Sequence, residues 1–404
     1  MAAMILTVLC GCLNNLSLYV LINLHKGPAN QGPLSLNTKA MKKVILFALF
    51  ALSFSALSAQ HKTQNVVIVT IDGLRWQEVF RGADSAIINS NDTHDKNDVR
   101  KNFWTEAAAD RRKLLMPFFW STVVEKGQLY GNRDLGSKDE IANPYHFSYP
   151  GYNEIFTGFP DKRMNTNDGI YNPNMNVLEF LNKQKGFENK VAAFASWERF
   201  SQILSPQRAG ILVNAGFMPL EIAGMNDRLK HLNELQLEAP RYISDSTRID
   251  FLTFEFAKNY MMQYKPRALY ISFDEPDDMA HAGNYKFYLD RIKQDDGFIK
   301  QLWDYIQSEP AYKNKTILII TCDHGRGDEP MKKWHDHGSD VLHSEQTWFA
   351  VIGPDTPASG EMKQGETTYH KQLAQTIANL LGFDFKAAAS HEVGEAINSV
   401  TGKK

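Results

Sequence analysis

From residue 65 onward, hydrophobic residues form short unbroken runs, separated by longer and more polar segments. The runs cover residues 65–71, 190–195, 268–273, 316–321 and 347–352. Apolar runs of this length, with no alternation of polar positions, are typical of strands that are covered on both faces in a parallel sheet. The pattern therefore predicts five buried strands.

The segments between these runs carry apolar stripes at the spacing of an amphipathic helix. The predicted helices cover residues 176–183, 247–264, 286–307 and 369–381. Strands that alternate with helices indicate an open α/β sandwich. We therefore predict a single α/β domain over residues 60–404, with a central, mostly parallel sheet covered by helices on both faces.

The start of the chain differs from this pattern. Met41-Lys42-Lys43 precedes an apolar run at 44–52, and small residues follow up to position 59. This order is typical of a secretory signal peptide. A transmembrane anchor is the alternative, but the apolar run is shorter than the roughly 20 residues that a span needs. We interpret 41–59 as a signal peptide and 1–40 as an upstream extension from a start codon placed too early, and we expect a periplasmic or secreted protein without a stable membrane span.

Charge and cysteine content narrow the possible functions. The 404 residues carry a formal net charge of −2, and no long Lys/Arg run is present, so no specific nucleic-acid partner is expected. Of the three cysteines only Cys322 follows the predicted signal peptide, which excludes an intrachain disulfide and a cysteine-based zinc site in the remaining chain. Any metal must therefore be held by His and carboxylate side chains.

Acidic residues and histidines follow the predicted strands. They are Asp72 after the first strand, Asp277 and His281 after the third, Asp323 and His324 after the fourth, and His337 ahead of the last. In open α/β sheets, ligands bind beyond the carboxyl ends of the strands. A single acidic residue at a strand end is usually a cap or turn residue. Four such clusters packed together would require compensating positive charge, which metal ions supply.

Five motifs lie in a defined order over about residues 65–354. They are Thr70-Ile71-Asp72-Gly73; Ser148-Tyr149-Pro150 followed by Thr157-Gly158; Glu275-Pro276-Asp277 with His281; Asp323-His324-Gly325; and His337-Gly338 ahead of Gly353-Pro354. In this layout the chain resembles the alkaline phosphatase superfamily, and it is similar to the nucleotide pyrophosphatase/phosphodiesterases within it. The resemblance implies a metal-dependent phosphoric ester hydrolase.

The resemblance also implies a role for each motif residue. One divalent ion, expected to be zinc from the donor types, would be held by Asp277, His281 and His337. The other would be held by Asp72, Asp323 and His324, with the Ser148 oxygen beside it or bridging. Ser148 would attack phosphorus and form a covalent phosphoseryl intermediate, which water then hydrolyses. His335 and His343 flank His337 and are alternative ligands if the register differs.

Departures from the family pattern bear on the substrate. Phosphodiesterase relatives usually carry Thr at the position of Ser148, whereas the phosphatases include examples with Ser. Sulfatases that use formylglycine carry Arg where this chain has Tyr152, and phosphodiesterase relatives carry Asn where it has Gly151. We therefore expect a small-molecule phosphate ester as substrate, and the choice between monoester and diester stays open.

Four residues are candidates for contact with the substrate. The family uses an Asn about twenty residues past the nucleophile to bond a phosphoryl oxygen, and Asn165, Asn167 and Asn172 fall nearby. We favour Asn172, whose alternative is a turn residue before a proline, and retain Asn167. Lys162 and Arg163 could bind a terminal phosphate, although a solvated loop is the commoner reading of such a pair.

Three other interpretations were weighed. A sulfatase-like or phosphoglycerate mutase-like member of the same superfamily would share the metal ligands, but the mutases are usually cytoplasmic. They also carry a large inserted domain, for which the segment between Ser148 and Asp277 leaves no room. A non-catalytic binding module on this fold would be signalled by lost ligands, and here all six ligands and the nucleophile are present. The sequence leaves the oligomeric state open.

Overall fold

The computed structural model describes residues 62–402, which lie in one compact unit, His61–Lys404. The predicted upstream extension at 1–40 and the predicted signal peptide at 41–59 lie outside the described residues. Among the described residues, no helix is both long enough and apolar enough to cross a membrane.

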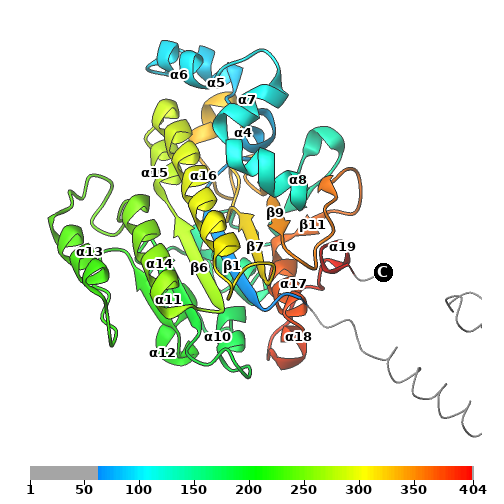
Figure 1. The fold of residues 1–404 in the computed structure, drawn as a ribbon. Coiled ribbons are helices and arrows are strands. Elements are labelled where there is room, and N and C mark those ends of the chain that lie inside the picture. Colours follow the sequence, from blue (N-terminus) through cyan, green and yellow to red (C-terminus); the bar gives the residue numbers. More distant parts are fainter. Residues whose placement is uncertain (1–61, 403–404) are drawn as a thin grey trace, which may run out of the picture. The chain divides into compact units, whose positions relative to one another are not determined.

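A central sheet of eight strands forms the middle layer, in the order β10-β2-β9-β7-β1-β6-β4-β5 (Figure 1). In that order the strands are Gly360–Glu361, Gln128–Tyr130, Phe349–Ile352, Thr316–Thr321, Asn65–Ile71, Ala268–Phe273, Val191–Ala195 and Leu212–Ala215. The five strands from β7 to β5 pair in parallel, and β9 pairs antiparallel with both β7 and β2. The sheet is thus mostly parallel, as predicted.

Helices cover both faces of the sheet because the side chains of β1 point alternately to two separate cores. Val67, Val69 and Ile71 pack into one core with residues of α14 (Asp250–Tyr264) and α16 (Tyr285–Ser308). Val66 and Ile68 pack into the other core. That core contains α9 (Ser148–Thr157), α10 (Val177–Asn182) and α17 (Leu373–Leu380). The predicted α/β sandwich is confirmed.

The remaining elements are short and lie around these layers. They are α4 (Trp76–Arg81), α5 (Ser85–Asn89), α6 (Lys96–Phe103), α7 (Ala108–Leu115), η1 (Phe119–Val123), α8 (Val124–Lys126), η2 (Arg133–Leu135), α11 (Phe200–Leu204), α12 (Pro206–Ala209), α13 (Asp227–Glu238), α15 (Glu275–His281), η3 (Met331–His335), η4 (His370–Gln372), α18 (Phe385–Ala388) and α19 (Asn398–Thr401). A second sheet of three strands has the order β11-β3-β8, formed by Thr368–Tyr369, Asp139–Glu140 and Gln346–Thr347.

The fifth predicted strand, 347–352, is wrong as a single strand. The chain leaves the small sheet after β8, passes through Trp348 and enters the central sheet as β9, antiparallel to β7. Trp348 is fully buried and its indole Nε1 donates to the Leu74 carbonyl oxygen at 2.9 Å. The apolar run reflects burial throughout, and burial alone does not reveal that the chain changes sheets.

The helix predictions agree with the structure apart from one element. The predicted segments 176–183, 247–264 and 286–307 correspond to α10, α14 and α16. The segment 369–381 begins with the 3₁₀ turn η4 before it continues as α17. Helix α9, which carries Ser148, was not predicted, because all ten of its residues are buried and it presents no amphipathic stripe.

Candidate active site

The order of the central strands brings the predicted ligands together. β7, β1 and β6 are adjacent and parallel, so their carboxyl ends lie side by side. Asp72 follows β1, Asp323 and His324 follow β7, and α15 begins two residues after β6. Residues that are far apart in the sequence therefore converge at one edge of the sheet, as the topology of open α/β sheets requires.

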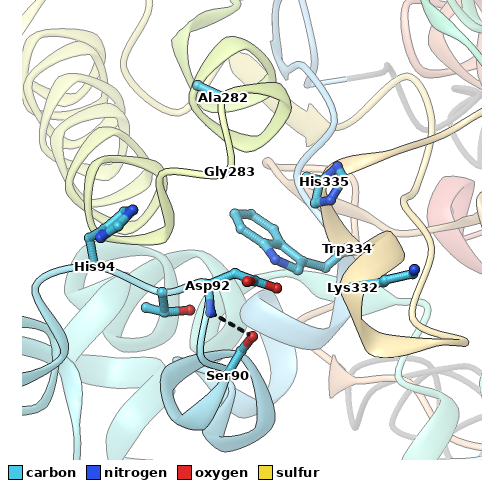
Figure 2. Close-up of a pocket in the computed structure, with 9 residues that line it drawn as sticks. Ser90, Asp92, His94, Ala282, Gly283, Lys332, Trp334 and His335 are labelled. Atoms are coloured by element: carbon cyan, nitrogen blue, oxygen red, sulfur yellow. Dashed lines mark hydrogen bonds between the residues drawn. The ribbon is translucent and has the colours of Figure 1, made fainter.

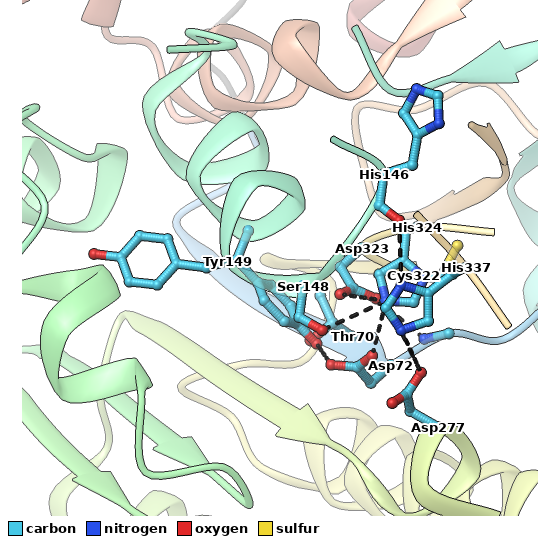
Figure 3. A network of polar contacts seen from close by, with 12 residues as sticks. Thr70, Asp72, His146, Ser148, Tyr149, Asp277, Cys322, Asp323, His324 and His337 are labelled. Carbon is cyan, nitrogen blue, oxygen red and sulfur yellow. Dashed lines mark hydrogen bonds and ion pairs between the residues drawn. The ribbon is translucent and has the colours of Figure 1, made fainter. Parts of the chain in front are cut away.

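The first cluster surrounds the His324 imidazole (Figure 3). Its Nε2 lies 3.4 Å from Asp72 Oδ1, 3.4 Å from Asp323 Oδ2 and 3.4 Å from Ser148 Oγ. Ligand atoms about 2.0–2.2 Å from one tetrahedral Zn²⁺ lie about 3.3–3.6 Å from each other. The three distances from His324 Nε2 therefore match those expected between ligands of one ion.

Two carboxylate oxygens in this cluster lack a hydrogen-bond partner. Asp72 Oδ1 and Asp323 Oδ2 are buried, and no donor among residues 62–402 reaches either of them. Their companion oxygens are satisfied, because Asp323 Oδ1 accepts from the Gly73 amide at 3.1 Å and Asp72 Oδ2 accepts from the Tyr152 hydroxyl at 2.8 Å. A buried carboxylate oxygen without a partner is costly, and a bound cation removes that cost.

The second cluster contains Asp277, His281 and His337. His281 Nε2 lies 3.2 Å from Asp277 Oδ2 and 2.9 Å from His337 Nε2. Asp277 and His337 also form a group with His324, and one ligand atom of each lies within 4.8 Å of the others. His281 Nε2 lies closer to Asp277 and His337 than the 3.9 Å between His324 Nε2 and Asp277 Oδ1. His324 also groups with Asp72 and Asp323, so it lies between the two clusters.

Backbone carbonyls orient two of the imidazoles. His324 Nδ1 lies 2.9 Å from the Gly325 oxygen, and His337 Nδ1 lies 3.2 Å from the His146 oxygen. A carbonyl oxygen can only accept, so the proton of each neutral ring is held on Nδ1. The Nε2 lone pairs then face the clusters, which is how outer contacts orient histidine ligands in metal sites.

The protonation equilibria agree with this reading. Burial lowers the pKa of His337 well below its usual value, so its imidazole is neutral and can bind a metal. Despite its burial, the carboxylates of Asp323 and Asp72 raise the pKa of His324 to about 9, so a metal must displace a proton from this ring. Burial and then the charge of Asp72 raise the pKa of Asp323 to about 8. The carboxylates thus repel each other in a buried site, and positive ions between them would relieve that repulsion.

Arg326 holds Asp277 in place, a contact that the sequence analysis did not anticipate. Its side chain is buried, and it donates to Asp277 Oδ1 and, at 2.7 Å, to the His335 carbonyl oxygen. Its Nε donates to the Gly73 carbonyl oxygen at 3.1 Å. Gly73 has a φ of +56°, and a Cβ there would lie 2.5 Å from Asp277 Oδ1. Asp277 Oδ2 is left to face His281.

Ser148 begins helix α9 and sits beside the first cluster. Pro150 fits the first turn, where backbone amides have no partner inside the helix. Gly151 packs against the Asp323 backbone so closely that a Cβ would lie 2.3 Å from the Asp323 carbonyl oxygen. A residue with a side chain would therefore not fit at this position without a shift of the backbone. The close approach brings Ser148 Oγ to His324.

Tyr152 is a further residue of the site whose role the sequence did not reveal. It lies one helical turn after Ser148 and is fully buried. Its hydroxyl donates to Asp72 Oδ2 at 2.8 Å. The only sequence signal was its position, where formylglycine sulfatases carry Arg.

The two asparagines predicted to bind substrate make hydrogen bonds within the protein. The Asn167 side-chain oxygen accepts from the Tyr149 amide at 3.0 Å, which fixes the first turn of α9. Asn172 is buried; its Nδ2 donates to Asn153 Oδ1 at 2.9 Å and its Oδ1 accepts from the Asn174 amide. Their proposed contacts with substrate stay predictions.

The two candidate cations and the two alternative histidines occupy loops. Lys162 is exposed, and Arg163 forms an ion pair with Asp161 at 2.6 Å. His335 lies 3.1 Å from Asp336, and His343 Nδ1 lies 2.5 Å from Asp328 Oδ1. Of the three histidines in this region, His337 is the one that contacts His281.

A family model and several solved structures resemble the chain. Residues 223–385 match the model described as the Metalloenzyme superfamily. This segment holds Asp277, His281, Asp323, His324 and His337, whereas Asp72 and Ser148 lie before it. No curated protein sequence matches the chain.

Three of the similar structures cover most of the chain. Alkaline phosphatase PafA aligns with a TM-score of 0.55 at 10% identity, over 84% of this chain and 99% of its own. A putative sulfatase from Bacteroides thetaiotaomicron aligns with a TM-score of 0.55 at 13% identity, over 85% of this chain and 75% of its own. A phosphonate monoester hydrolase of Agrobacterium radiobacter aligns with a TM-score of 0.54 at 12% identity, over 84% and 78%.

At these identities the solved structures establish the fold, and the family match adds the class. The family match covers residues 223–385, which hold five of the candidate ligands, and it agrees with a metal-binding enzyme. The fold is that of the alkaline phosphatase, sulfatase and phosphonate hydrolase structures, in agreement with the resemblance that the motifs indicated.

Proposed function

We propose that the protein is a two-metal hydrolase of phosphate esters, a phosphomonoesterase or phosphodiesterase, that forms a covalent phosphoseryl intermediate on Ser148. The observation that supports this is the position of Ser148 Oγ, 3.4 Å from His324 Nε2, which is equally far from the Asp72 and Asp323 carboxylates. A serine oxygen at ligand distance from such a cluster is placed to act as an activated nucleophile.

The donor atoms favour zinc. The two clusters offer imidazole nitrogens and carboxylate oxygens, and the free Cys322 is buried outside both groups of ligands. Two zinc ions held by Asp72, Asp323 and His324 and by Asp277, His281 and His337 would lower the pKa of the serine hydroxyl and stabilise charge on the leaving oxygen.

The chain's own groups orient the reaction. Ser148 Oγ releases its proton to solvent and forms the bond to phosphorus, while the bond to the leaving oxygen breaks on the opposite side and that oxygen takes up a proton from solvent. The N-terminus of α9 lies at Ser148, and no acceptor among residues 62–402 receives the Ser148 amide. That amide and the positive end of the helix can bind a phosphoryl oxygen. Water then breaks the Ser148–phosphorus bond and returns the proton to Oγ.

A sulfate ester is the second candidate, because the fold is shared with a putative sulfatase. Tyr152 argues for phosphate: it occupies the position of the sulfatase Arg, and its hydroxyl is bonded to Asp72. Without that Arg the chain departs from the pattern for formylglycine formation, so a sulfatase of this type would lack its usual nucleophile.

The test compares hydrolysis of p-nitrophenyl phosphate, bis-p-nitrophenyl phosphate and p-nitrophenyl sulfate, with Zn²⁺ and after chelation. We expect chelator-sensitive hydrolysis of at least one phosphate ester, and phosphate trapped covalently on the wild type but not on Ser148→Ala. Activity on the sulfate alone would replace the proposal with a sulfatase. Absence of chelator-sensitive activity on all three would refute an ester hydrolase, and phosphate trapped on Ser148→Ala would move the nucleophile elsewhere.

The periplasmic or secreted location is also a proposal, based on the pattern at 41–59. A cleaved and exported chain would begin near Gln60. N-terminal sequencing of the protein from its native host would show that terminus, and a mature chain that retains Met41 would contradict it.

A further inference from the structure

A cavity of about 250 Å³ lies at the end of α15, beside His281 (Figure 2). It is lined by the loop after α5, by the two residues that follow His281 and by the turn η3. Among residues 62–402, no hydrogen bond or ion pair joins a side chain of this lining to Ser148 or to a predicted ligand. The segment that contacts both the nucleophile helix and a predicted ligand is the turn at residues 142–146, which precedes α9.

The side chain of Asn143 shapes this turn. It is buried, and its Oδ1 accepts from the Tyr145 amide and from the His146 amide, each at 3.1 Å. An asparagine that bonds backbone amides two and three residues further on fixes a turn locally. His146 has a φ of +56°, in the left-handed region, which residues other than glycine adopt only where their surroundings hold them. The bond from its amide to Asn143 is one such constraint.

Glu154 holds Asn143 from within α9. It lies six residues after Ser148, and its carboxylate is fully buried. Its Oε2 accepts from Asn143 Nδ2 at 3.0 Å and from the Asn143 amide at 2.9 Å. Its Oε1 accepts from the Ala142 amide at 2.8 Å and from the Lys371 amide at 3.0 Å. The helix that begins at Ser148 is therefore tied back to the turn that precedes it.

The turn also contacts the second cluster, through His146 (Figure 3). The His146 carbonyl oxygen accepts from His337 Nδ1 at 3.2 Å. The His146 imidazole Nδ1 lies 3.2 Å from Ser344 Oγ, which donates to the Gly338 carbonyl oxygen at 2.8 Å. The backbone and the side chain of one residue thus hold the segment that carries His337. Because Ser148 follows His146 by two positions, the same turn places the serine and a predicted ligand.

We propose that Asn143, held by Glu154, is a positioning residue that sets two parts of the active site at once: the His337 ligand and the Ser148 nucleophile. Without the Asn143 side chain, the His146 amide loses its acceptor, and the His146 carbonyl oxygen is free to move away from His337. Loss of an outer contact of this kind lowers metal affinity about 10- to 100-fold. The part that concerns Ser148 rests on the proposed function, whereas the part that concerns His337 requires only metal binding.

The first test measures zinc affinity by competition against a chromophoric chelator. We expect the wild type to bind two ions per chain, and Asn143→Ala to bind one of them about tenfold more weakly. Asn143→Ser keeps an oxygen that can accept from a nearby amide, although more weakly, and should recover part of the loss. Asn176→Ala is the matched control. Asn176 is also buried and its Oδ1 accepts from the Glu179 amide at 2.8 Å, but its side chain contacts no predicted ligand, so both zinc affinities should stay unchanged.

A double-mutant comparison separates positioning from general stability. If Asn143 acts through His337, Asn143→Ala should have no further effect on zinc affinity in a chain that already carries His337→Ala. The same loss in both backgrounds, or a loss in Asn176→Ala as well, would overturn the proposal. Equal zinc affinity of Asn143→Ala and the wild type would also overturn it. If Asn143→Ala does not fold, the milder Asn143→Ser enters the same comparison with the same expected and contrary outcomes.

Steady-state assays with saturating Zn²⁺ test the part that concerns Ser148. Asn143→Ala should lower kcat at least about tenfold, because a displaced serine oxygen is misaligned for attack, while KM changes less than about threefold. An unchanged kcat would overturn this part of the proposal and leave the hydrolase intact. If no phosphate ester is hydrolysed by the wild type but the zinc results are as expected, the proposed function fails and the role of Asn143 at His337 stands.

Discussion

Removing one hydroxyl group from helix α9 should weaken metal binding, although that hydroxyl is not itself a predicted ligand. The Tyr152 hydroxyl donates to Asp72 Oδ2 at 2.8 Å, and both residues are buried. Its ring packs edge-on against Phe200 with centroids 4.6 Å apart, so Tyr152→Phe should leave the ring in place. Burial and the charges of Asp323 and Asp72 raise the pKa of Tyr152 well above its usual value, so the hydroxyl remains a donor over the working pH range.

The size of the effect follows from the contact that is lost. Without the hydroxyl, Asp72 Oδ2 has no donor, and its carboxylate is free to rotate away from His324. Loss of an outer contact of this kind lowers metal affinity about 10- to 100-fold, which corresponds to about 1.4–2.7 kcal/mol. An unsatisfied buried acceptor carries a penalty of about 1–3 kcal/mol, in the same range.

The assay is competition for Zn²⁺ against a chromophoric chelator, which reads affinity without relying on activity. Tyr149→Phe is the matched control, because it is the same substitution in the first turn of α9. The Tyr149 hydroxyl donates to the Ile170 carbonyl oxygen at 2.5 Å and contacts no predicted ligand. Tyr149→Phe should therefore bind zinc as the wild type does, although it loses a hydrogen bond of its own.

Two results would refute the reasoning. Equal zinc affinity for Tyr152→Phe and the wild type would show that Asp72 needs no support from Tyr152 or is not a ligand. Equal weakening in both variants would show that α9 acts through general stability and not through Asp72. A urea unfolding curve for each variant separates these cases from a loss of folding.

Four further predictions concern the same site and the core. Gly151→Ala should lower kcat at least tenfold in steady-state assays, because a Cβ 2.3 Å from the Asp323 oxygen would push α9 and its serine away; unchanged kcat would contradict the close approach. Arg326→Met should lower the free energy of unfolding in urea by about 3–5 kcal/mol, since it removes one partner of a buried ion pair with Asp277, and a loss below 1 kcal/mol would argue against it. Chelation should lower Tm and added Zn²⁺ should restore it in calorimetry, whereas a Tm insensitive to both would count against metal binding. Burial raises the pKa of Asp296 to about 6, so the folded state favours the protonated carboxyl group. Its contribution to the free energy of unfolding, up to about 3 kcal/mol, is present below pH 4 and is lost as the pH rises to about 6. Asp296→Asn should remove that part of the pH dependence of stability, and unfolding curves of the variant that keep it would contradict the assignment.

The sequence by itself determined most of the sheet and the identity of the candidate ligands. Continuous apolar runs marked β1, β4, β6 and β7, because strands buried on both faces have no polar positions. Once a parallel sheet was inferred, the polar residues at strand ends were expected to meet. The motif order then added the expectation for Ser148. The strands and the meeting of the strand-end residues follow from local patterns and a general rule of topology, whereas the role of Ser148 is implied by the family resemblance.

Tertiary structure decided the contacts that support the ligands. Tyr152 reaches Asp72 across 80 positions of sequence, and Arg326 reaches Asp277 across 49. Neither contact leaves a local pattern, since each depends on how α9, α15 and the loop after β7 pack at the sheet edge. The need for glycine at positions 73 and 151 also depends on tertiary structure, because a Cβ there would collide only with a neighbouring chain segment.

The cavity beside His281 shows the same limit most clearly. Its walls come from the loop after α5, the end of α15 and η3, which lie about 190 and 50 positions apart in the sequence. The residue types that carry the chemistry can be read from strand ends, because a strand's direction fixes where its last residue points. The cavity at the end of α15 is lined by loop residues, and only the folded chain brings those loops together.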